Sequence, residues 1–297
     1  MTSFSGSPGG PVRRRSLDHL SVLRSLTERD RFVVNLLGEH QVLTTGQVTQ
    51  LAFPRLDVAQ RRLLRLVRLG VLDRFRPYAA VGSRPWHYTV GPVGASLAAA
   101  QRGADPPSPA ALRRRTTRLA ESPRLAHLVG CNGWFCALAA YARAGEGRQV
   151  AAWWSERRTA ARFGALVRPD AYGAWVEGGR RVGFFVEYDT GTEVVGRVAA
   201  KLDGYAELAA AGGPRVPVLM WLASATREAH LQRALASRPG PPTVATATAE
   251  LASATRACPA DSLWLVPGAG RRLQLVDLPS GTEHPRPADD GLLWDEE

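Results

Sequence analysis

Residues Arg168–Tyr205, RPDAYGAWVEGGRRVGFFVEYDTGTEVVGRVAAKLDGY, predict a hairpin of two strands followed by a helix. The first strand begins directly after a Pro-Asp pair, and the second ends in the run Glu187-Tyr188-Asp189. Side chains alternate between the two faces of a strand, so Glu187 and Asp189 are expected on one face, with Asp170 on the neighbouring strand. The sequence therefore predicts three carboxylates gathered at one end of a sheet.

Neighbouring carboxylates repel one another unless a cation lies between them, and a hard divalent metal such as Mg²⁺ or Mn²⁺ is the usual solution. Metal held by strand carboxylates, together with a lysine, is how many nucleases activate water against a phosphodiester. Lys201 lies on the predicted helix and is the only lysine in the chain. The candidate metal ligands are thus Asp170, Glu187 and Asp189, and the candidate catalytic residues are Asp170, Glu187 and Lys201.

The same residues also have a purely structural explanation. Asp or Thr often caps a helix that follows a strand, and residues 189–192 read Asp-Thr-Gly-Thr. Glu187 would then be a structural partner for Arg168 or Arg180. Short motifs of this kind often match by chance, so both explanations stay open on the sequence alone.

A second signal lies earlier in the chain, where residues 21–103 predict a winged helix-turn-helix. The expected elements are three helices followed by a two-stranded hairpin, at 28–39, 46–53, 56–69, 71–75 and 86–90. In this arrangement the third helix enters the major groove of DNA and the hairpin, or wing, lies beside the backbone.

The third of these helices carries an apolar stripe and a row of cations. The stripe expected in the core consists of Leu56, Ala59, Leu63, Leu66 and Val67. Four arginines fall off that stripe, and a fifth lies in the wing; these candidate DNA-binding residues are Arg61, Arg62, Arg65, Arg68 and Arg84. A charged helix face is otherwise simply a solvated face, and only the hairpin beside it favours DNA binding.

The composition is that of a globular protein large enough for two domains. Of the 297 residues, 45% are hydrophobic, and 38 basic residues against 27 acidic ones give a net charge of +11. A basic globular chain most often meets nucleic acid. Three cysteines without metal-ligand spacing, and the lack of a signal peptide or an evident membrane segment, predict a cytoplasmic protein with no membrane partner.

The expected fold class is α/β, with the winged helix-turn-helix followed by a second domain of mixed strands and helices. The expected organisation is a flexible basic arm, the winged helix-turn-helix, a Pro/Arg-rich linker, the second domain and an acidic tail, at 1–20, 21–103, 104–122, 123–280 and 281–297. The arginines of the linker either follow phosphates or only aid solubility.

Several segments resemble, in one order, the replication-relaxation family of actinobacterial plasmids and mobile elements. They are LTTGQVTQLAF (43–53), RLLRLVRLGVLDRF (62–75), GSRPWHY (82–88), PDAYGAW (169–175), FFVEYDTGTE (184–193) and KLDGY (201–205). The resemblance implies a winged-helix protein that binds double-stranded DNA in plasmid replication and in the control of DNA relaxation. It also suggests a relaxase or replication initiator as a protein partner, and a homodimer is a further expectation.

The second domain resembles the restriction-endonuclease-like fold, whose pattern is PD…(D/E)xK. Asp170 matches the first carboxylate and Glu187 the second, but Asp189 stands where that pattern has lysine. Lys201 would replace that lysine from the helix, and Glu156 would supply a further carboxylate. The resemblance implies either a Mg²⁺- or Mn²⁺-dependent DNA endonuclease or a domain that keeps the fold without cleavage. The alternatives are a winged-helix transcriptional regulator and a non-catalytic partner of a relaxase or initiator.

Overall fold

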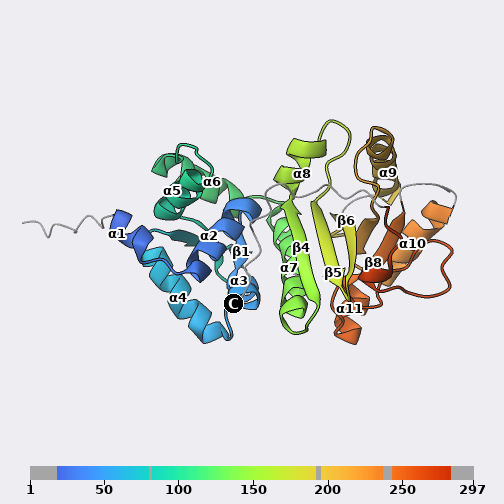
Figure 1. The fold of residues 1–297 in the computed structure, drawn as a ribbon, viewed down its shortest axis with the longest axis horizontal. Helices are drawn as coiled ribbons and strands as arrows, with labels where there is room; N and C mark the ends of the chain where they lie inside the picture. Colours follow the sequence, from blue (N-terminus) through green and yellow to red (C-terminus); the bar gives the residue numbers. More distant parts are fainter. Residues whose placement is uncertain (1–18, 80–81, 192–194, 237–242, 282–297) are drawn as a thin grey trace, which may run out of the picture.

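The structure is a computed structural model that describes residues 19–79, 82–191, 195–236 and 243–281 (Figure 1). It is a mixed α/β protein, as expected, in which an N-terminal unit lies beside a larger unit built on a central sheet. Most of the predicted basic arm and nearly all of the predicted acidic tail lie outside the described residues.

The N-terminal unit consists of helices around a small antiparallel sheet with the strand order β1-β3-β2. The helices are α1 (His19–Arg24), α2 (Glu28–His40), α3 (Thr45–Ala52), α4 (Leu56–Arg68) and α5 (Pro92–Gln101), and the strands are β1 (Leu43–Thr44), β2 (Leu72–Phe75) and β3 (His87–Val90). The elements that the sequence predicts here occur within one or two residues of the expected bounds. Both α2 and α3 begin with capping boxes, Thr27 with Asp30 and Thr44 with Gln47, which satisfy the free amides of the first turn.

Helix α4 buries the middle of the predicted apolar stripe, whereas Val67 is partly buried and Leu56 is exposed. Ala59, Leu63 and Leu66 are completely buried, whereas Leu56 is 50% exposed. The prediction that Leu56 belongs to the core is therefore wrong. Leu56 is the first residue of the helix, a turn before the stripe reaches the core, so its side chain remains in solvent.

The larger unit contains a five-stranded sheet in the order β4-β5-β6-β7-β8. Neighbouring strands are antiparallel from β4 to β6 and parallel from β6 to β8. The strands are β4 (Arg148–Ser155), β5 (Ala171–Glu177), β6 (Arg180–Tyr188), β7 (Val218–Leu222) and β8 (Val244–Thr248). Gly178 and Gly179 form the two-residue turn between β5 and β6, and both have positive φ (58° and 75°), the conformation that a tight hairpin turn of this length requires.

Helices cover both faces of this sheet. On one face, α7 (Leu125–Arg143), α11 (Ala249–Thr255) and the segment through the short helix η1 (Leu275–Asp277) pack around Trp134, Phe184 and Trp264. On the other face, α8 (Glu156–Phe163), α9 (Val195–Ala210) and α10 (Ala225–Ala236) pack on a second cluster around Phe185. Phe184 and Phe185 are neighbours on β6 but belong to different clusters, because successive side chains of a strand point to opposite faces of the sheet.

Two further features complete the larger unit. Helix α8 begins directly where β4 ends, because Ser155 caps it by accepting from the amide of Arg158 (3.3 Å). Residues 263–266 pair only through isolated bridges, from Leu265 to Thr246 and from Trp264 to Leu273. The helix that the sequence predicts after the hairpin is α9, and residues 192–194 before it lie outside the described part of the chain.

The predicted linker 104–122 is not an irregular segment, because it contains helix α6 (Pro109–Ala120). Ser108 caps this helix by accepting from the amide of Ala111 (3.2 Å), and Pro109 occupies the first turn, where a missing amide costs nothing. Leu112 is buried and fixes the helix to the protein.

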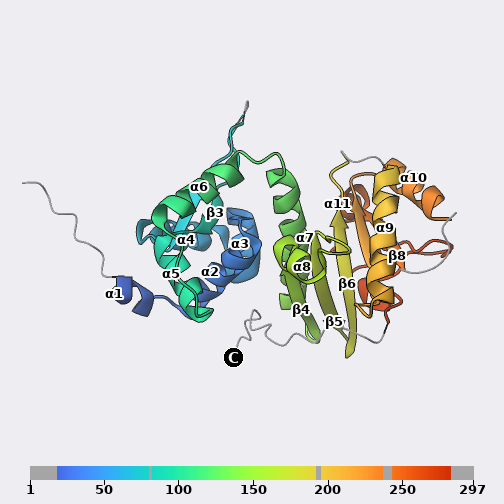
Figure 2. The same ribbon diagram turned by 90° about the horizontal axis from the view of Figure 1, so that it is seen from above.

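Helix α7 joins the two units, and Figure 2 shows it between the N-terminal unit and the sheet. The side-chain amide of Asn132 donates to the carbonyl oxygens of His40 (3.1 Å) and Val42 (2.8 Å). The amide of Gln47 donates to the carbonyl oxygen of Val129 (2.7 Å). By length and composition α7 is apolar enough to cross a membrane, but here it is a shared core helix that both units contact.

Candidate functional site

Asp170 and Glu187 lie opposite each other on neighbouring strands. Ala171, the first residue of β5, pairs with Val186 of β6, so Asp170 directly before β5 lies beside the end of β6 that carries Glu187. The backbone amide of Tyr188 donates to Asp170 Oδ2 (2.9 Å), which holds that carboxylate against the end of β6. The side chains of Asp170 and Glu187 are only 10% and 5% exposed. The structure therefore brings together two of the three carboxylates that the sequence predicts at this end of the sheet.

Glu187 accepts hydrogen bonds at both of its carboxylate oxygens from helix α9. Lys201 Nζ donates to Oε2 (2.9 Å), and the Tyr205 hydroxyl donates to Oε1 (2.5 Å). Burial, followed by the negative charge of Asp170, raises the pKa of Glu187 to about 7, although Lys201 and Tyr205 act in the opposite direction. Near neutral pH the carboxyl group of Glu187 is therefore present in both its protonated and its ionised form.

Asp170 faces two basic side chains at the N-terminal end of helix α7. His127 Nε2 lies 3.0 Å from Asp170 Oδ1, and Arg124 lies 4.0 Å from the same oxygen and 3.1 Å from Glu156. Burial lowers the pKa of His127, but the neighbouring Asp170 outweighs this and raises it above its ordinary value. The sequence alone indicates that His127 is an ordinary helix residue, because nothing local connects it to Asp170, which lies directly before β5 much later in the chain.

Asp189 does not join this pair as a third free carboxylate. Its Oδ2 accepts from Arg227 on α10, and its Oδ1 accepts from the amide of Gly191 (2.8 Å). The strand β6 ends at Tyr188, so the alternation that predicts Asp189 on the face of Glu187 stops one residue early. Within the described ranges, no group of three His, Cys, Asp or Glu side chains is placed to hold a metal ion.

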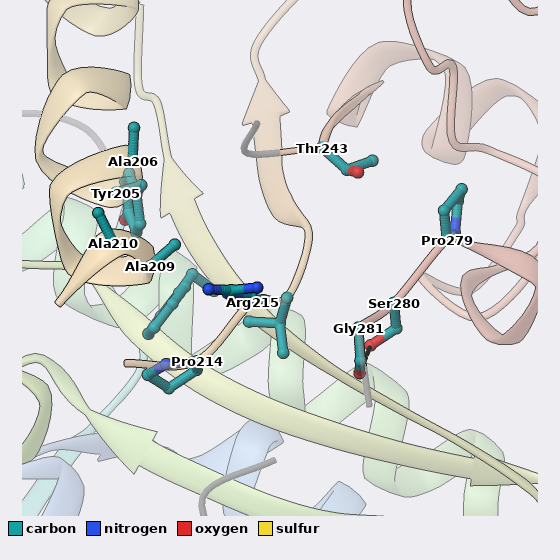
Figure 3. A pocket seen from close by; sticks show the side chains of 12 residues that line it. Tyr205, Ala206, Ala209, Ala210, Pro214, Arg215, Thr243, Pro279, Ser280 and Gly281 are labelled. Carbon is teal, nitrogen blue, oxygen red and sulfur yellow. Dashed lines mark hydrogen bonds between the residues drawn. The ribbon is translucent and has the colours of Figure 1, made fainter. Parts of the chain in front are cut away.

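Two cavities border the site. A narrow cleft between the units reaches Asp170, and its walls include Gln41 of the N-terminal unit with His127, Asn132 and Glu156 of the other. A larger cavity of about 620 Å³ lies behind Tyr205. Figure 3 shows its lining, in which Arg215 lies between α9 and the segment of residues 279–281.

The five predicted DNA-binding arginines divide into two groups. Arg61, Arg65 and Arg68 are exposed on α4, and Arg84 is exposed in the loop between β2 and β3. Arg62 is different, because its guanidinium pairs with Asp30 of α2, which is 1% exposed. The prediction that Arg62 faces DNA is not supported by this arrangement, since its charge already neutralises a buried carboxylate.

The hairpin of β2 and β3 carries further cations that the sequence reasoning missed. The guanidinium groups of Arg74 and Arg76 lie 4.0 and 4.2 Å from the ring centre of Trp86. Tyr78 beside them is 90% exposed. The signal was present as Arg-Phe-Arg-Pro-Tyr at residues 74–78, but only the paired strands show that these side chains share one hairpin with Trp86.

Together, these features define an α/β protein with an arginine-bearing N-terminal unit and a buried carboxylate–lysine cluster in its sheet unit. Residues 34–217 match the replication-relaxation family, and this match covers more than half of the chain. The chain therefore belongs to the replication-relaxation family, which confirms the resemblance and indicates a role in plasmid or mobile-element replication. No curated protein and no solved structure matches the chain.

Proposed function

We propose that this protein binds double-stranded DNA through its N-terminal unit during plasmid or mobile-element replication. The observation that carries the proposal is the exposed edge of α4, where Arg65 and Arg68 form no ion pair within the described part of the chain. The order of three helices and a hairpin supports a recognition helix with a wing beside it. A cytoplasmic location and a relaxase or initiator as partner belong to the same proposal.

Replacing Arg65 and Arg68 with alanine is expected to weaken binding of a short duplex about tenfold or more, since each lost arginine contact to DNA costs about 1–3 kcal/mol. Stability should hardly change, because both side chains are exposed. Fluorescence anisotropy with a labelled duplex measures the affinity, and Arg181→Ala, an exposed arginine of the sheet unit, is the control. Unchanged affinity in the double variant would contradict the proposal.

A second candidate function is cleavage of the DNA backbone at Asp170, Glu187 and Lys201. The observation in its favour is that two buried carboxylates face each other across β5 and β6, with Lys201 2.9 Å from one of them. This donor set fits Mg²⁺ or Mn²⁺, since such ions often take one or two carboxylates and complete their coordination with water and substrate phosphate. Asp170 and Glu187 would hold the ion, and Asp189, bonded to Arg227, would not.

Lys201 and His127 would have roles of their own at this site. A bound ion of this kind would supply a water of lowered pKa and charge stabilisation at the phosphate. Lys201 would stabilise the negative charge that develops on the phosphate, as positioned cations do at such sites. His127 would be a positioning residue, because it lies 3.0 Å from Asp170 and holds that carboxylate from α7.

Millimolar Mg²⁺ or Mn²⁺ is expected to raise the melting temperature of the protein, because the folded state binds the ion and the unfolded chain hardly does. Asp170→Asn should abolish that increase, whereas Asp189→Asn should retain it. Lys201→Met should keep the metal-dependent increase and lose nicking of supercoiled DNA. The measurements are thermal unfolding with and without chelator, and plasmid nicking on gels.

Two outcomes would change this second candidate. A melting temperature indifferent to metal would make the carboxylates structural, and the sheet unit would then be a nuclease-like fold used for binding. Nicking that persists in Lys201→Met would make the lysine an ordinary partner of Glu187.

A further inference from the structure

Helix α6 has a face of arginines that the binding and cleavage proposals do not use. Its sequence, PAALRRRTTRLA, contains four arginines and no acidic residue. With Arg102 at the end of α5 they form the surface that we call the α6 surface: Arg102, Arg113, Arg114, Arg115 and Arg118. All five are exposed, and none makes a side-chain hydrogen bond or an ion pair within the described part of the chain.

What distinguishes the α6 surface from other exposed arginine sites is the density of its charge, with four arginines within six residues and no acidic residue in the helix. Arg55 and Arg61 pair with Asp57, Arg124 pairs with Glu156, and Arg180 pairs with Asp277. Exposed arginines such as Arg181 and Arg215 also form no ion pair within the described residues, but they lie singly on the sheet unit and not in a cluster on one helix. A merely solvated helix face usually mixes both signs of charge, and this one does not.

The fold also holds these like charges close together. Leu112 and Thr116 face the N-terminal unit, where the Thr116 hydroxyl lies 3.4 Å from that of Thr89. Arg115 keeps part of its side chain in solvent, but partial burial of the guanidinium, followed by the charges of Arg157 on α8 and of Arg102, lowers its pKa. Such a cluster is stabilised when an anion binds to it.

The α6 surface lies on a different side of the N-terminal unit from α4. Figure 1 draws α6 at the top of that unit, beside α5 and near α8, and α4 at the bottom. Figure 2, seen from above, has α6 in front and α4 behind it. A straight duplex bound along α4 therefore does not also run along α6.

We propose that the α6 surface is a second DNA-binding surface, which holds the phosphate backbone of a duplex, so that one molecule binds two duplex segments at once. The proposal rests on the proposed DNA binding by α4. Arg114 and Arg118 are one helical turn apart on the outer face, as expected for side chains that contact successive backbone phosphates. Binding there is independent of base sequence and strongly weakened by salt.

A bridging experiment tests this inference. Beads carrying one duplex are mixed with the full-length protein and a second, labelled duplex, and the retained label is counted. The wild-type protein should retain the label, and the variant Arg113→Gln/Arg114→Gln/Arg118→Gln should retain about tenfold less. That variant should still bind a single duplex through α4, with a shallower dependence of affinity on salt.

Two matched variants separate charge number from position. Arg181→Gln/Arg215→Gln/Arg233→Gln removes three exposed arginines from the sheet unit and should bridge like the wild type. The variant with lysine at 113, 114 and 118 keeps the charges and should also bridge. Because the replaced side chains are exposed, melting temperatures should agree among all of these proteins.

The outcomes of the experiment distinguish the two proposals. Normal bridging by the α6 glutamine variant would overturn the α6 inference, and this includes bridging through a dimer held by another surface. An equal loss of bridging in the sheet-unit control variant would overturn it as well. If instead the α4 variant Arg65→Ala/Arg68→Ala binds a single duplex normally and only the α6 variant loses it, α4 is not the DNA reader and the α6 surface stands alone.

Discussion

Replacing Arg62 with alanine is expected to destabilise the N-terminal unit by about 3 kcal/mol, because it leaves a buried charge without its partner. Asp30 is 1% exposed and accepts from Arg62 and from the amide and hydroxyl of Thr27, both at 2.8 Å. Burial alone would raise the pKa of Asp30, but the hydrogen bonds from Arg62 and Thr27 outweigh it and lower the pKa. Without Arg62, Asp30 must either stay charged in an apolar site or take up a proton.

The same helix offers a matched control. Arg61 pairs with Asp57 at 3.0 Å, but both side chains are more than half exposed (74% and 55%). An exposed pair of this kind contributes between zero and about 1 kcal/mol, so Arg61→Ala should leave the free energy of unfolding almost unchanged. Guanidinium unfolding of both variants measures the difference, and equal losses would mean that the Arg62–Asp30 pair contributes no more than a surface contact.

This contrast also shows what sequence periodicity can and cannot predict. The stripe of Ala59, Leu63 and Leu66 identifies which face of α4 is buried. It does not separate Arg61 from Arg62, because both lie off the stripe. Only the packing of α2 against α4 brings Asp30 to one of them, and no local pattern records a contact between residues so far apart in the chain.

The candidate site shows the same limit. The hairpin from Ala171 to Tyr188 was predictable, because it consists of two apolar strands around a Gly-Gly turn, and its register sets Asp170 against Glu187. The partners of these carboxylates come from helices that pack on opposite faces of the sheet. His127 on α7 and Tyr205 on α9 are therefore invisible to a motif that follows only the strands.

Composition misled the prediction for residues 104–122. Three prolines and four arginines suggest a linker, but the local signals for a helix were present in Ser108-Pro109 and in the spacing of Leu112, Thr116 and Leu119. The firm connection between the two units likewise depends on tertiary contacts, above all those of Asn132 and Gln47. The sequence pattern predicts the helices and strands, whereas these contacts depend on how the helices and strands pack against one another.

Replacing His40 with phenylalanine is expected to make the protein markedly more resistant to acid. His40 is 1% exposed at the junction of the units, stacks on Trp153 with ring centres 3.8 Å apart, and has no partner for either ring nitrogen within the described residues. Burial lowers its pKa to about 3, with the charges of Arg157 and Arg158 acting in the same direction and that of Glu39 against it. The folded protein thus keeps this ring neutral where the unfolded chain protonates it.

The sign of the effect follows from this difference in pKa. Between the ordinary histidine pKa of about 6.5 and the folded value of about 3, the unfolded state binds more protons. Stability is therefore present above the unfolded pKa and falls as pH falls, by up to about 1.4 kcal/mol per pH unit from this one group. Phenylalanine preserves the stack on Trp153 and has no proton to bind.

Denaturant unfolding of the wild type and of His40→Phe at several pH values from 7 to 4 measures the prediction. The advantage of the variant should grow by about 3 kcal/mol over that interval, while acid effects shared with other groups cancel. His230→Gln, which changes an exposed histidine on α10, should follow the wild type throughout. Parallel curves for His40→Phe and the wild type would show that water or another group reaches the ring, and that the junction between the units is looser than the contacts of Trp153 and Asn132 indicate.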